Sequence, residues 1–189
     1  DHMVGDAISN GILTREIWDL YDQAERGMPF ALPPLPVQFA DYAVWQQSTY
    51  DAWRIRHEGY WKERLIGAPK TRVPPDDGLA EVQCPDGATL HASFSSGLSG
   101  KLREVAQREG TLIQVVVLAV YAIVMSRWCS QDDVVLAIAL HGRYGRPELE
   151  NMIGFLANFV YLRIRTTEQS NFLDLIKAVH AEFAAASEH

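Results

Sequence analysis

The sequence predicts an α/β (α+β) fold in which helices pack on one sheet. Residues 134–140 form a continuous apolar run, which is typical of a strand covered on both faces. Segments on both sides of this run repeat apolar residues at helical spacing. From residue 89 onward the predicted order is strand–helix–helix–strand–strand–helix, which indicates helices packed on a single sheet. The length of 189 residues and the hydrophobic content of 48% suit one globular core.

Residues 1–65 are expected to be mainly helical. Ser9 or Asn10 can cap a first helix, and Gly27 ends it. The prolines of residues 28–36 cannot continue a helix, so this stretch is predicted to be a stiff linker. A second helical region starts near Val37 and continues to Gly67. The apolar residues at helical spacing in the first helix are Leu13, Ile17, Leu20 and Ala24. In the second, Phe39, Tyr42, Trp45 and Thr49 lie along one face, and this aromatic stripe is expected to be core.

Residues 66–88 are rich in Pro, Asp and Gly, which indicates a boundary between two structural units. Beyond this boundary the expected elements are, in order, a strand over 89–94, a helix from Ser99 to Gly110, a buried helix capped by Thr111 and running through Met125, a strand over 134–140, a strand over 159–165, and an amphipathic helix over 171–186 with Phe172, Leu175, Ile176, Val179 and Phe183 inward.

Composition argues against several classes of protein. The net charge is −7 and the basic residues are scattered, which disfavours a nucleic-acid or anionic-membrane partner. The longest apolar run, from Leu112 to Met125, is shorter than the roughly 18 residues that a membrane span needs. Cys84 and Cys129 show neither metal-ligand spacing nor a disulfide framework. We therefore expect a cytoplasmic protein without nucleic-acid, membrane or metal binding.

Three stretches hold polar side chains in a suggestive setting. Residues 1–9 place His2 four positions before Asp6, just ahead of a helix start, which can hold an imidazole at the mouth of a cleft or can be a frayed terminus. In residues 141–154 an apolar strand runs into a turn that contains Arg143, and in residues 155–163 Asn158 interrupts an apolar run. Taken alone, Arg143 fits a solvated turn and Asn158 fits a side chain bonded to nearby backbone.

Together these stretches resemble the condensation domains of nonribosomal peptide synthetases. The active-site motif of that family is His-His-x-x-x-Asp-Gly, and residues 1–7 match it with two departures, Asp1 in place of the first His and Ala7 in place of the Gly. The other stretches that match blocks of the family, in the family's order, are residues 38–46, 60–69 and 143–154, followed by Asn158 and Arg163.

The resemblance implies part of a two-lobed, chloramphenicol-acetyltransferase-like fold. Residues 1–65 would form the end of the N-terminal lobe, residues 66–88 the inter-lobe linker, and residues 89–189 part of the C-terminal lobe. The matched region begins within the active-site motif, so the missing lobe segments of the same domain are expected partners. The chain by itself is expected to be inactive, because the family's substrate tunnel needs both lobes.

The resemblance also implies a reaction and its participants. Condensation domains form an amide, or in some cases an ester, between an acyl donor and an aminoacyl acceptor. Both substrates are carried on 4′-phosphopantetheine arms of donor and acceptor carrier proteins, and no cofactor or metal is bound by the domain itself. His2 takes the position of the second motif His, which accepts a proton from the attacking amine or orients it. Asp6 is expected to pair with Arg143 and fix the loop that bears His2, while the residues expected to line the tunnel are Gly5, Ala7, Ser9 and Asn158.

Two other interpretations stay open. Asp1, Asp6 and Ser9 fit the Asp-x-x-x-x-Asp-x-x-Ser pattern of heterocyclisation domains, which condense and then cyclise Cys, Ser or Thr. The two departures from the motif also fit a non-catalytic module that docks a carrier protein or recruits another enzyme. Ala7 in particular can change the shape of the turn, because Gly tolerates backbone angles that Ala resists.

Overall fold

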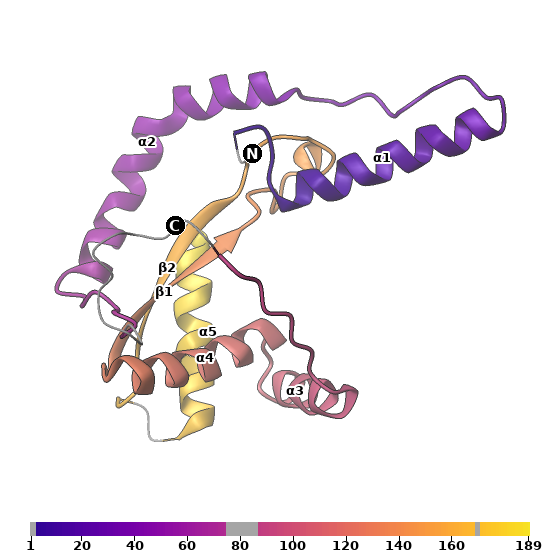
Figure 1. Cartoon of the computed structure of the whole chain (residues 1–189). Coiled ribbons are helices and arrows are strands. Elements are labelled where there is room, and N and C mark those ends of the chain that lie inside the picture. Colours follow the sequence, from indigo (N-terminus) through magenta and orange to yellow (C-terminus); the bar gives the residue numbers. More distant parts are fainter. Residues whose placement is uncertain (1–2, 75–86, 169–170) are drawn as a thin grey trace. The chain divides into compact units, whose positions relative to one another are not determined.

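A computed structural model describes residues 3–74, 87–168 and 171–189 of the chain (Figure 1). Its elements are, in order, α1 (Ala7–Glu25), α2 (Phe39–Leu65), α3 (Ser96–Arg108), α4 (Ile113–Cys129), β1 (Asp133–Leu140), the short 3₁₀ helix η1 (Pro147–Leu149), β2 (Asn158–Arg165) and α5 (Phe172–Glu188). Asp1, His2, Cys84 and residues 75–86 of the expected linker lie outside the described residues.

The chain divides into two compact units. The first unit combines residues 1–59 with residues 138–160, and the second combines residues 60–137 with residues 161–189. Each unit is therefore built from segments that are far apart in the sequence. The division falls within α2, β1 and β2, so each of these elements contributes residues to both units.

In the first unit, α1 begins earlier than predicted. Asp6 is its N-cap, and the Asp6 side chain accepts a hydrogen bond from the backbone N–H of Ser9. The prediction of Ser9 or Asn10 as the cap is therefore wrong. The predicted end is confirmed, because Gly27 follows the helix with a φ of 62°. Only Ser9 and Ile12 of α1 are buried; of the apolar residues at helical spacing, Leu13 and Ile17 are exposed and Leu20 is half-buried.

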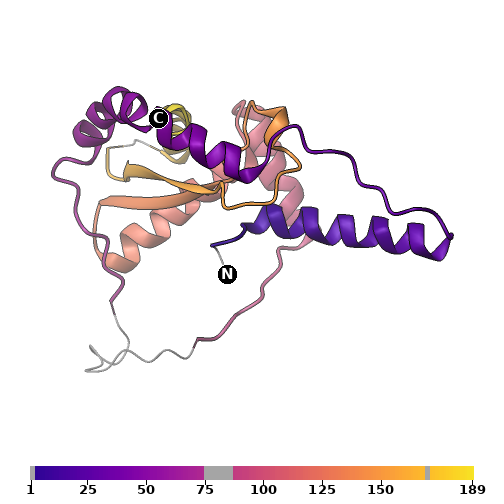
Figure 2. The same ribbon diagram turned by 90° about the horizontal axis from the view of Figure 1, so that it is seen from above.

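Residues 28–36 are extended, as the prolines predict, and lead from α1 to α2. The Gln23 side chain holds this segment through two hydrogen bonds with Ala31, one from its amide N–H to the backbone oxygen (2.9 Å) and one from the backbone N–H to its amide oxygen (2.7 Å). Figure 2 shows the segment returning along α1. The second helical region is confirmed as one continuous helix of 27 residues, α2.

The aromatic stripe of α2 is only partly core. Phe39 and Tyr42 pack against a buried cluster formed by Leu149, Met152 and Leu156. Trp45 is exposed instead, and the guanidinium of Arg146 lies 4.2 Å from the centre of its ring. Phe39 and Tyr42 therefore cover the segment between β1 and β2, whereas Trp45 faces solvent.

In the second unit, α4 packs against both α3 and α5 (Figure 1). α3 begins at Ser96 with Ser95 as its N-cap, so the predicted start at Ser99 is too late; Ser95 accepts from the backbone N–H of Leu98. Thr111 does not cap α4, which has no side-chain cap. Its hydroxyl lies 2.6 Å from Nδ1 of His180 on α5 and so ties the start of α4 to that helix.

β1 and β2 pair in a two-stranded sheet. In the part of β1 that belongs to the second unit, Val134 and Leu136 are buried while Ala137 is exposed, so the prediction that both faces are covered is wrong. The apolar run did not predict burial on both faces, because an alanine in such a run can also be exposed to solvent. Residues 89–94 form no strand, and Leu90 is 93% exposed. They have no neighbouring strand within the described ranges, and an isolated strand leaves its backbone groups unpaired.

The remaining predictions for the second unit are confirmed for the elements but only in part for burial. The strand over 159–165 is confirmed as β2, and the helix after Asn171 is confirmed as α5, with Asn171 as its N-cap. Leu175, Ile176 and Val179 of α5 are buried, whereas Phe172 is exposed. α4 buries one face only, since Val120 and Val124 are exposed.

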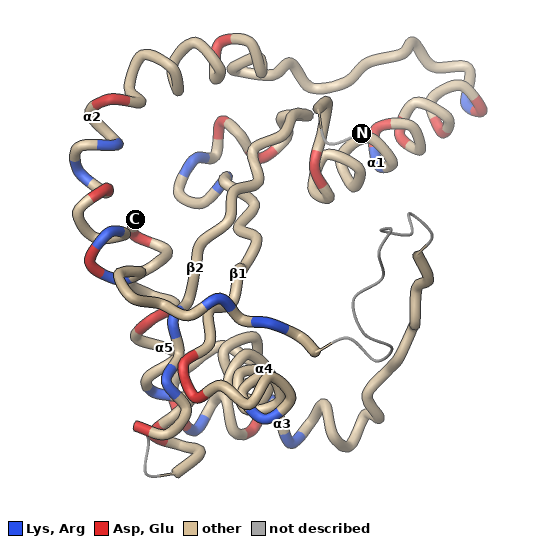
Figure 3. Tube along the Cα trace, turned by 60° about the vertical axis from the view of Figure 1, so that its left-hand side comes forward, with Lys and Arg blue, Asp and Glu red and all other residues tan. Residues whose placement is uncertain are grey.

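Charged residues are unevenly distributed over the helices. Figure 3 shows acidic and basic positions interspersed along α2, whereas α4 has a charged residue only at Arg127. Among the described residues, no single helix is long and apolar enough to cross a membrane, and only α3 and α4 taken together, across a bend of 105°, meet such a test by length and composition.

Candidate functional site

A buried ion pair joins the start of α1 to the turn after β1. Arg143 Nη1 lies 2.9 Å from Asp6 Oδ2, and Arg143 Nη2 lies 3.2 Å from Asp6 Oδ1. The two side chains are only 3% and 4% exposed. The family resemblance predicted this contact, and the geometry is the two-pronged arrangement in which a planar guanidinium matches a carboxylate.

Asp6 is held by more than this arginine. Its Oδ1 accepts from the backbone N–H of Ser9 at 2.9 Å, and its Oδ2 accepts from the backbone N–H of Leu156 at 3.1 Å. Burial by itself raises the pKa of the Asp6 carboxyl, but the hydrogen bonds from Arg143, Ser9 and Leu156 together hold this pKa well below its usual range. The Asp6 side chain is therefore held in place as an ionised carboxylate.

Ser9 connects the ion pair to the segment before β2. Its hydroxyl oxygen accepts from the backbone N–H of Gly154 at 3.1 Å and from Arg143 Nη2 at 3.2 Å. The hydroxyl proton is within reach of two acceptors, Asp6 Oδ1 at 2.8 Å and the carbonyl oxygen of Gly154 at 2.9 Å. Ser9 is 2% exposed. In the first unit the buried Ser9 hydroxyl therefore bonds Asp6, Arg143 and Gly154 at once.

Arg143 is also bonded to its own loop. Nη1 donates to the carbonyl oxygen of His141 and Nη2 donates to the carbonyl oxygen of Met152, each at 3.0 Å. Within the described part of the chain its Nε is buried without a hydrogen-bond partner. The guanidinium thus holds together the two ends of residues 141–154 as well as the start of α1.

Two glycines permit this loop to close on itself and on α2. Gly142 has a φ of 70°, and a Cβ at this position would collide with the carbonyl oxygen of Leu156. A Cβ on Gly154 would collide with the ring of Phe39. Only glycine avoids both the left-handed strain and the collision at residue 142. These contacts bring Leu156 and Gly154 to the positions from which they bond Asp6 and Ser9.

The other predicted site residues lie around this cluster. Gly5 is half-buried, and Ala7 is the exposed first residue of α1. Ala7 is helical and does not have a positive φ, so alanine fits there without strain. Asn158 is exposed at the start of β2, and its Oδ1 accepts from the backbone N–H of Phe159 at 2.9 Å. His2 lies outside the described residues, so the catalytic and tunnel-lining roles stay predictions.

Sequence reasoning missed the full part that Ser9 plays, and it missed the backbone groups of Leu156 and Met152. The signal for Ser9 was present. Asp6 stands three positions before Ser9 at the start of a helix, which is the spacing at which an N-cap side chain accepts from the third helical residue. The backbone contacts had no such signal, because any residue type offers the same N–H and C=O groups.

A second ion pair lies in the second unit. Arg163 of β2 donates from Nη2 to Asp133 Oδ2 at 2.7 Å and from Nε to Oδ1 at 3.1 Å. Its Nη1 also donates to the carbonyl oxygen of Ile66 at 2.8 Å, just past the end of α2. The Arg163 hydrogen bond lowers the pKa of the Asp133 carboxyl, and Asp133 in turn raises the pKa of Arg163. This pair fixes the end of α2 beside the sheet.

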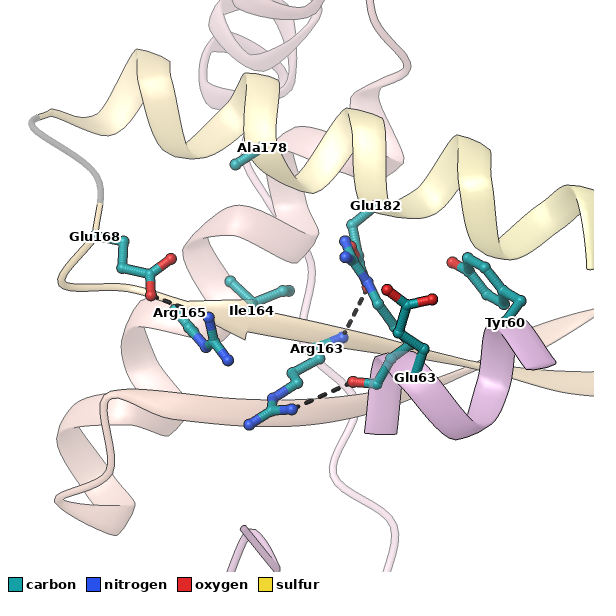
Figure 4. A pocket seen from close by; sticks show the side chains of 9 residues that line it. Tyr60, Glu63, Arg163, Ile164, Arg165, Glu168, Ala178 and Glu182 are labelled. Carbon is teal, nitrogen blue, oxygen red and sulfur yellow. Dashed lines mark hydrogen bonds and ion pairs between the residues drawn. The ribbon is translucent and has the colours of Figure 1, made fainter. Parts of the chain in front are cut away.

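A pocket of about 490 Å³ opens beside this second pair (Figure 4). Its lining residues come from the end of α2, from β2 and the turn after it, and from α5: Tyr60, Glu63, Arg64, Arg163, Ile164, Arg165, Glu168, Ala178 and Glu182. Its arginines are paired, Arg64 with Glu182, Arg163 with Asp133, and Arg165 with Asp133 and Glu168. Each guanidinium among the described lining residues is therefore already paired with a carboxylate. Among the described residues, no group of three or more His, Cys, Asp or Glu side chains could hold a metal ion.

Comparison with known proteins gives the family. Residues 2–189 match the family model described as Condensation domain, and the chain belongs to this family. It is 37% identical over 180 residues to phosphinothricin tripeptide synthetase PhsC of Streptomyces viridochromogenes, an alignment that covers 94% of this chain and 16% of that protein. The chain thus spans less than a fifth of the length of this relative. The predicted resemblance is confirmed.

Solved structures establish the fold. The X-domain from teicoplanin biosynthesis superimposes with a TM-score of 0.84 at 24% identity, over 98% of this chain and 43% of that one. The first condensation domain of the CDA synthetase superimposes with a TM-score of 0.81 at 20% identity, over 100% of this chain and 42% of that one. The predicted α/β class and the partial chloramphenicol-acetyltransferase-like fold are confirmed.

Proposed function

We propose that the chain is part of a condensation domain that forms an amide bond in a nonribosomal peptide synthetase. The donor acyl group and the acceptor aminoacyl group are each carried on the 4′-phosphopantetheine arm of a carrier protein, and a hydroxyl acceptor would give an ester instead. The buried Asp6–Arg143 pair carries the proposal, because it fixes Asp6, the motif residue four positions after His2. Membership of the condensation family supports the same conclusion.

The proposed reaction is aminolysis of a thioester. The acceptor amine attacks the donor carbonyl carbon, a C–N bond forms, the C–S bond breaks, and the donor arm leaves as a thiol. The amine loses a proton in the process, and His2 either accepts this proton or holds the amine in position through a hydrogen bond. Bringing two tethered reactants to about 3–3.5 Å of each other supplies a large share of the rate.

Asp6 and Arg143 are proposed to position His2 and not to take part in proton transfer. Oδ1 of Asp6 faces Ser9 and Arg143, and Oδ2 faces Arg143 and Leu156, so neither oxygen is left for a substrate. The lowered pKa of Asp6 also makes it a poor proton acceptor. Gly5, Ala7, Ser9 and Asn158 remain the proposed residues near the tunnel.

We further propose the division into lobes that the resemblance implies. Residues 1–65 belong to the N-terminal lobe, residues 66–88 connect the lobes, and residues 89–189 belong to the C-terminal lobe. The matched solved domains are more than twice as long as this chain, which supports a partial domain. The proposed partners are the donor and acceptor carrier proteins and the other segments of the same domain.

The test is product formation by the intact condensation domain with loaded donor and acceptor carrier proteins, followed by mass spectrometry. We expect an amide product from the unaltered domain and a rate lower by about 10²-fold or more in His2→Ala, the range for loss of a general base. His91→Ala removes an exposed histidine from residues 87–95 and serves as the matched control, with an unchanged rate.

The outcomes separate the alternatives. A product lighter by one further water indicates heterocyclisation. Equal product formation by the unaltered domain and His2→Ala that is no faster than without any domain, or no product from either, favours a non-catalytic module that binds a carrier protein or another enzyme.

A further inference from the structure

His141 lies directly after β1 and has no part in the proposed chemistry. Its Nδ1 accepts a hydrogen bond from the backbone N–H of Arg143 at 3.2 Å. Its backbone carbonyl oxygen accepts from Nη1 of the same arginine at 3.0 Å. One residue therefore holds both the main chain and the side chain of Arg143, the arginine that pairs with Asp6.

The His141 turn has two neighbours. The Tyr144 ring lies against the His141 ring, with ring centres 3.9 Å apart. Gly142, between His141 and Arg143, has a φ of 70° and lies against the carbonyl of Leu156, so the turn cannot relax towards that side. The imidazole thus closes a tight turn over residues 141–143, as an Asx side chain closes a turn by bonding the N–H two residues on.

The hydrogen bond places a chemical requirement on residue 141. Nδ1 can accept only while it carries a lone pair, so the neutral ring must hold its proton on Nε2. A side chain of similar size without an acceptor at that place cannot close the turn. The requirement is for an acceptor atom and not for bulk.

We propose that His141 is a positioning residue, whose Nδ1 acceptor sets the turn that aims Arg143 at Asp6. The inference rests on the proposed function to the extent that the Asp6–Arg143 pair positions His2. Loss of the acceptor loosens the turn and shifts the guanidinium, and Asp6, four positions after the proposed catalytic His2, then loses its fixed partner. Displacements of about 1 Å in such a site can cost about 10²-fold in rate.

The test compares two substitutions in the intact condensation domain. His141→Leu keeps an apolar side chain but has no acceptor, whereas His141→Asn places Oδ1 where it can accept from the N–H two residues on. We expect kcat for amide formation to fall about tenfold or more in His141→Leu and to stay within about threefold of the unaltered domain in His141→Asn. We expect the KM for each loaded carrier protein to stay unchanged in both, because a positioning residue acts on the chemical step.

His91→Leu serves as the control for loss of a histidine, and thermal unfolding shows that each variant is folded at the assay temperature. The proposal is overturned by an unchanged kcat in His141→Leu, or by a His141→Asn variant as slow as His141→Leu. Loss of kcat together with a raised KM would also overturn it, because it would indicate a general disturbance of the domain.

A spectroscopic measurement separates this inference from the proposed function. Two-bond ¹H–¹⁵N correlation of the imidazole, assigned by its absence in His141→Asn, reports which ring nitrogen holds the proton. We expect the proton on Nε2, and a proton on Nδ1 overturns the inference whether or not the domain forms amides. If the unaltered domain forms no amide but the Nε2 proton is observed, the proposed function has failed and the turn geometry stands.

Discussion

Asp6 and Arg143 lie 137 positions apart in the sequence, yet their side chains form a two-pronged ion pair that is almost completely buried. Both oxygens of the Asp6 carboxylate also accept hydrogen bonds from backbone N–H groups, Oδ1 from Ser9 and Oδ2 from Leu156. Removing one member of such a pair is costly because the other stays buried without a counter-charge. The stability of the first unit should therefore depend on this contact more than on any surface ion pair.

Asp6→Asn should lower the free energy of unfolding of the condensation domain by about 3–5 kcal/mol, since it leaves Arg143 buried and unpaired. Asp22→Asn is the matched control on the same helix, because Asp22 is 65% exposed and contacts Arg26 at 3.6 Å. Its effect should stay within about 0.5 kcal/mol. Urea denaturation measures both values, and equal effects of the two substitutions would refute the importance assigned to the pair.

The contribution of Asp6 should depend on pH in a defined direction. The pKa of its carboxyl is lowered in the folded state, so at acidic pH the folded protein binds fewer protons at Asp6 than the unfolded chain does. Its contribution is fully present above the unfolded pKa of about 3.9 and is lost as pH falls below that value towards the folded pKa. The difference in unfolding free energy between the unaltered domain and Asp6→Asn should be constant from pH 5 to 7 and should shrink by pH 3. A difference that grows on acidification would contradict this assignment.

Gly142→Ala should be more damaging than Gly145→Ala, although both glycines have positive φ, 70° and 67°. A Cβ on Gly142 meets the carbonyl of Leu156, whereas a Cβ on Gly145 meets nothing within 4 Å. We expect a loss of about 2–4 kcal/mol for Gly142→Ala, which combines the left-handed strain with overpacking, and about 1 kcal/mol for Gly145→Ala. Denaturant unfolding of both variants gives the comparison, and equal losses would mean that the loop can move away from residue 142.

Arg163→Lys should destabilise the second unit even though it keeps the charge. A lysine cannot reproduce the fork that bonds both oxygens of Asp133 and the carbonyl of Ile66. We expect a loss of about 2 kcal/mol in unfolding free energy. Arg165→Lys is the control, because Arg165 is 49% exposed and should cost about 0.5 kcal/mol. If Arg163→Lys is no worse than Arg165→Lys, then charge alone accounts for the contact.

Much of the secondary structure could be predicted from local pattern. The prolines before α2, Gly27 after α1 and Asn171 before α5 act within a few residues, so their effects are visible in the sequence. Burial was predicted less well. The apolar run of β1 and the apolar face of α1 show what can be buried, but only tertiary neighbours decide what is buried. The strand predicted over residues 89–94 is wrong for the same reason, because residues with strand propensity form a strand only where a second strand pairs with them.

The candidate site divides in the same way. The pairing of Asp6 with Arg143 came from the family resemblance, since no local rule links residues so far apart. The cap formed by Asp6 was visible in the spacing to Ser9, but the first prediction assigned the cap to the wrong residue. The contribution of His141 could not be predicted, because it depends on the backbone angle of Gly142 and on the direction of the ring.

Asp6 caps α1 and also accepts from the backbone of Leu156, while Ser9 accepts from the backbone of Gly154, 145 positions along the chain. Fraying of the first turn of α1 and release of the segment before β2 are therefore a single opening event. The amide protons of Ser9, Gly154 and Leu156 should exchange with solvent at one common opening free energy. Because the contacts of Asp6 with Leu156 and of Ser9 with Gly154 close a very long loop, we expect them to form later in folding than the local bond from the Ser9 N–H to Asp6.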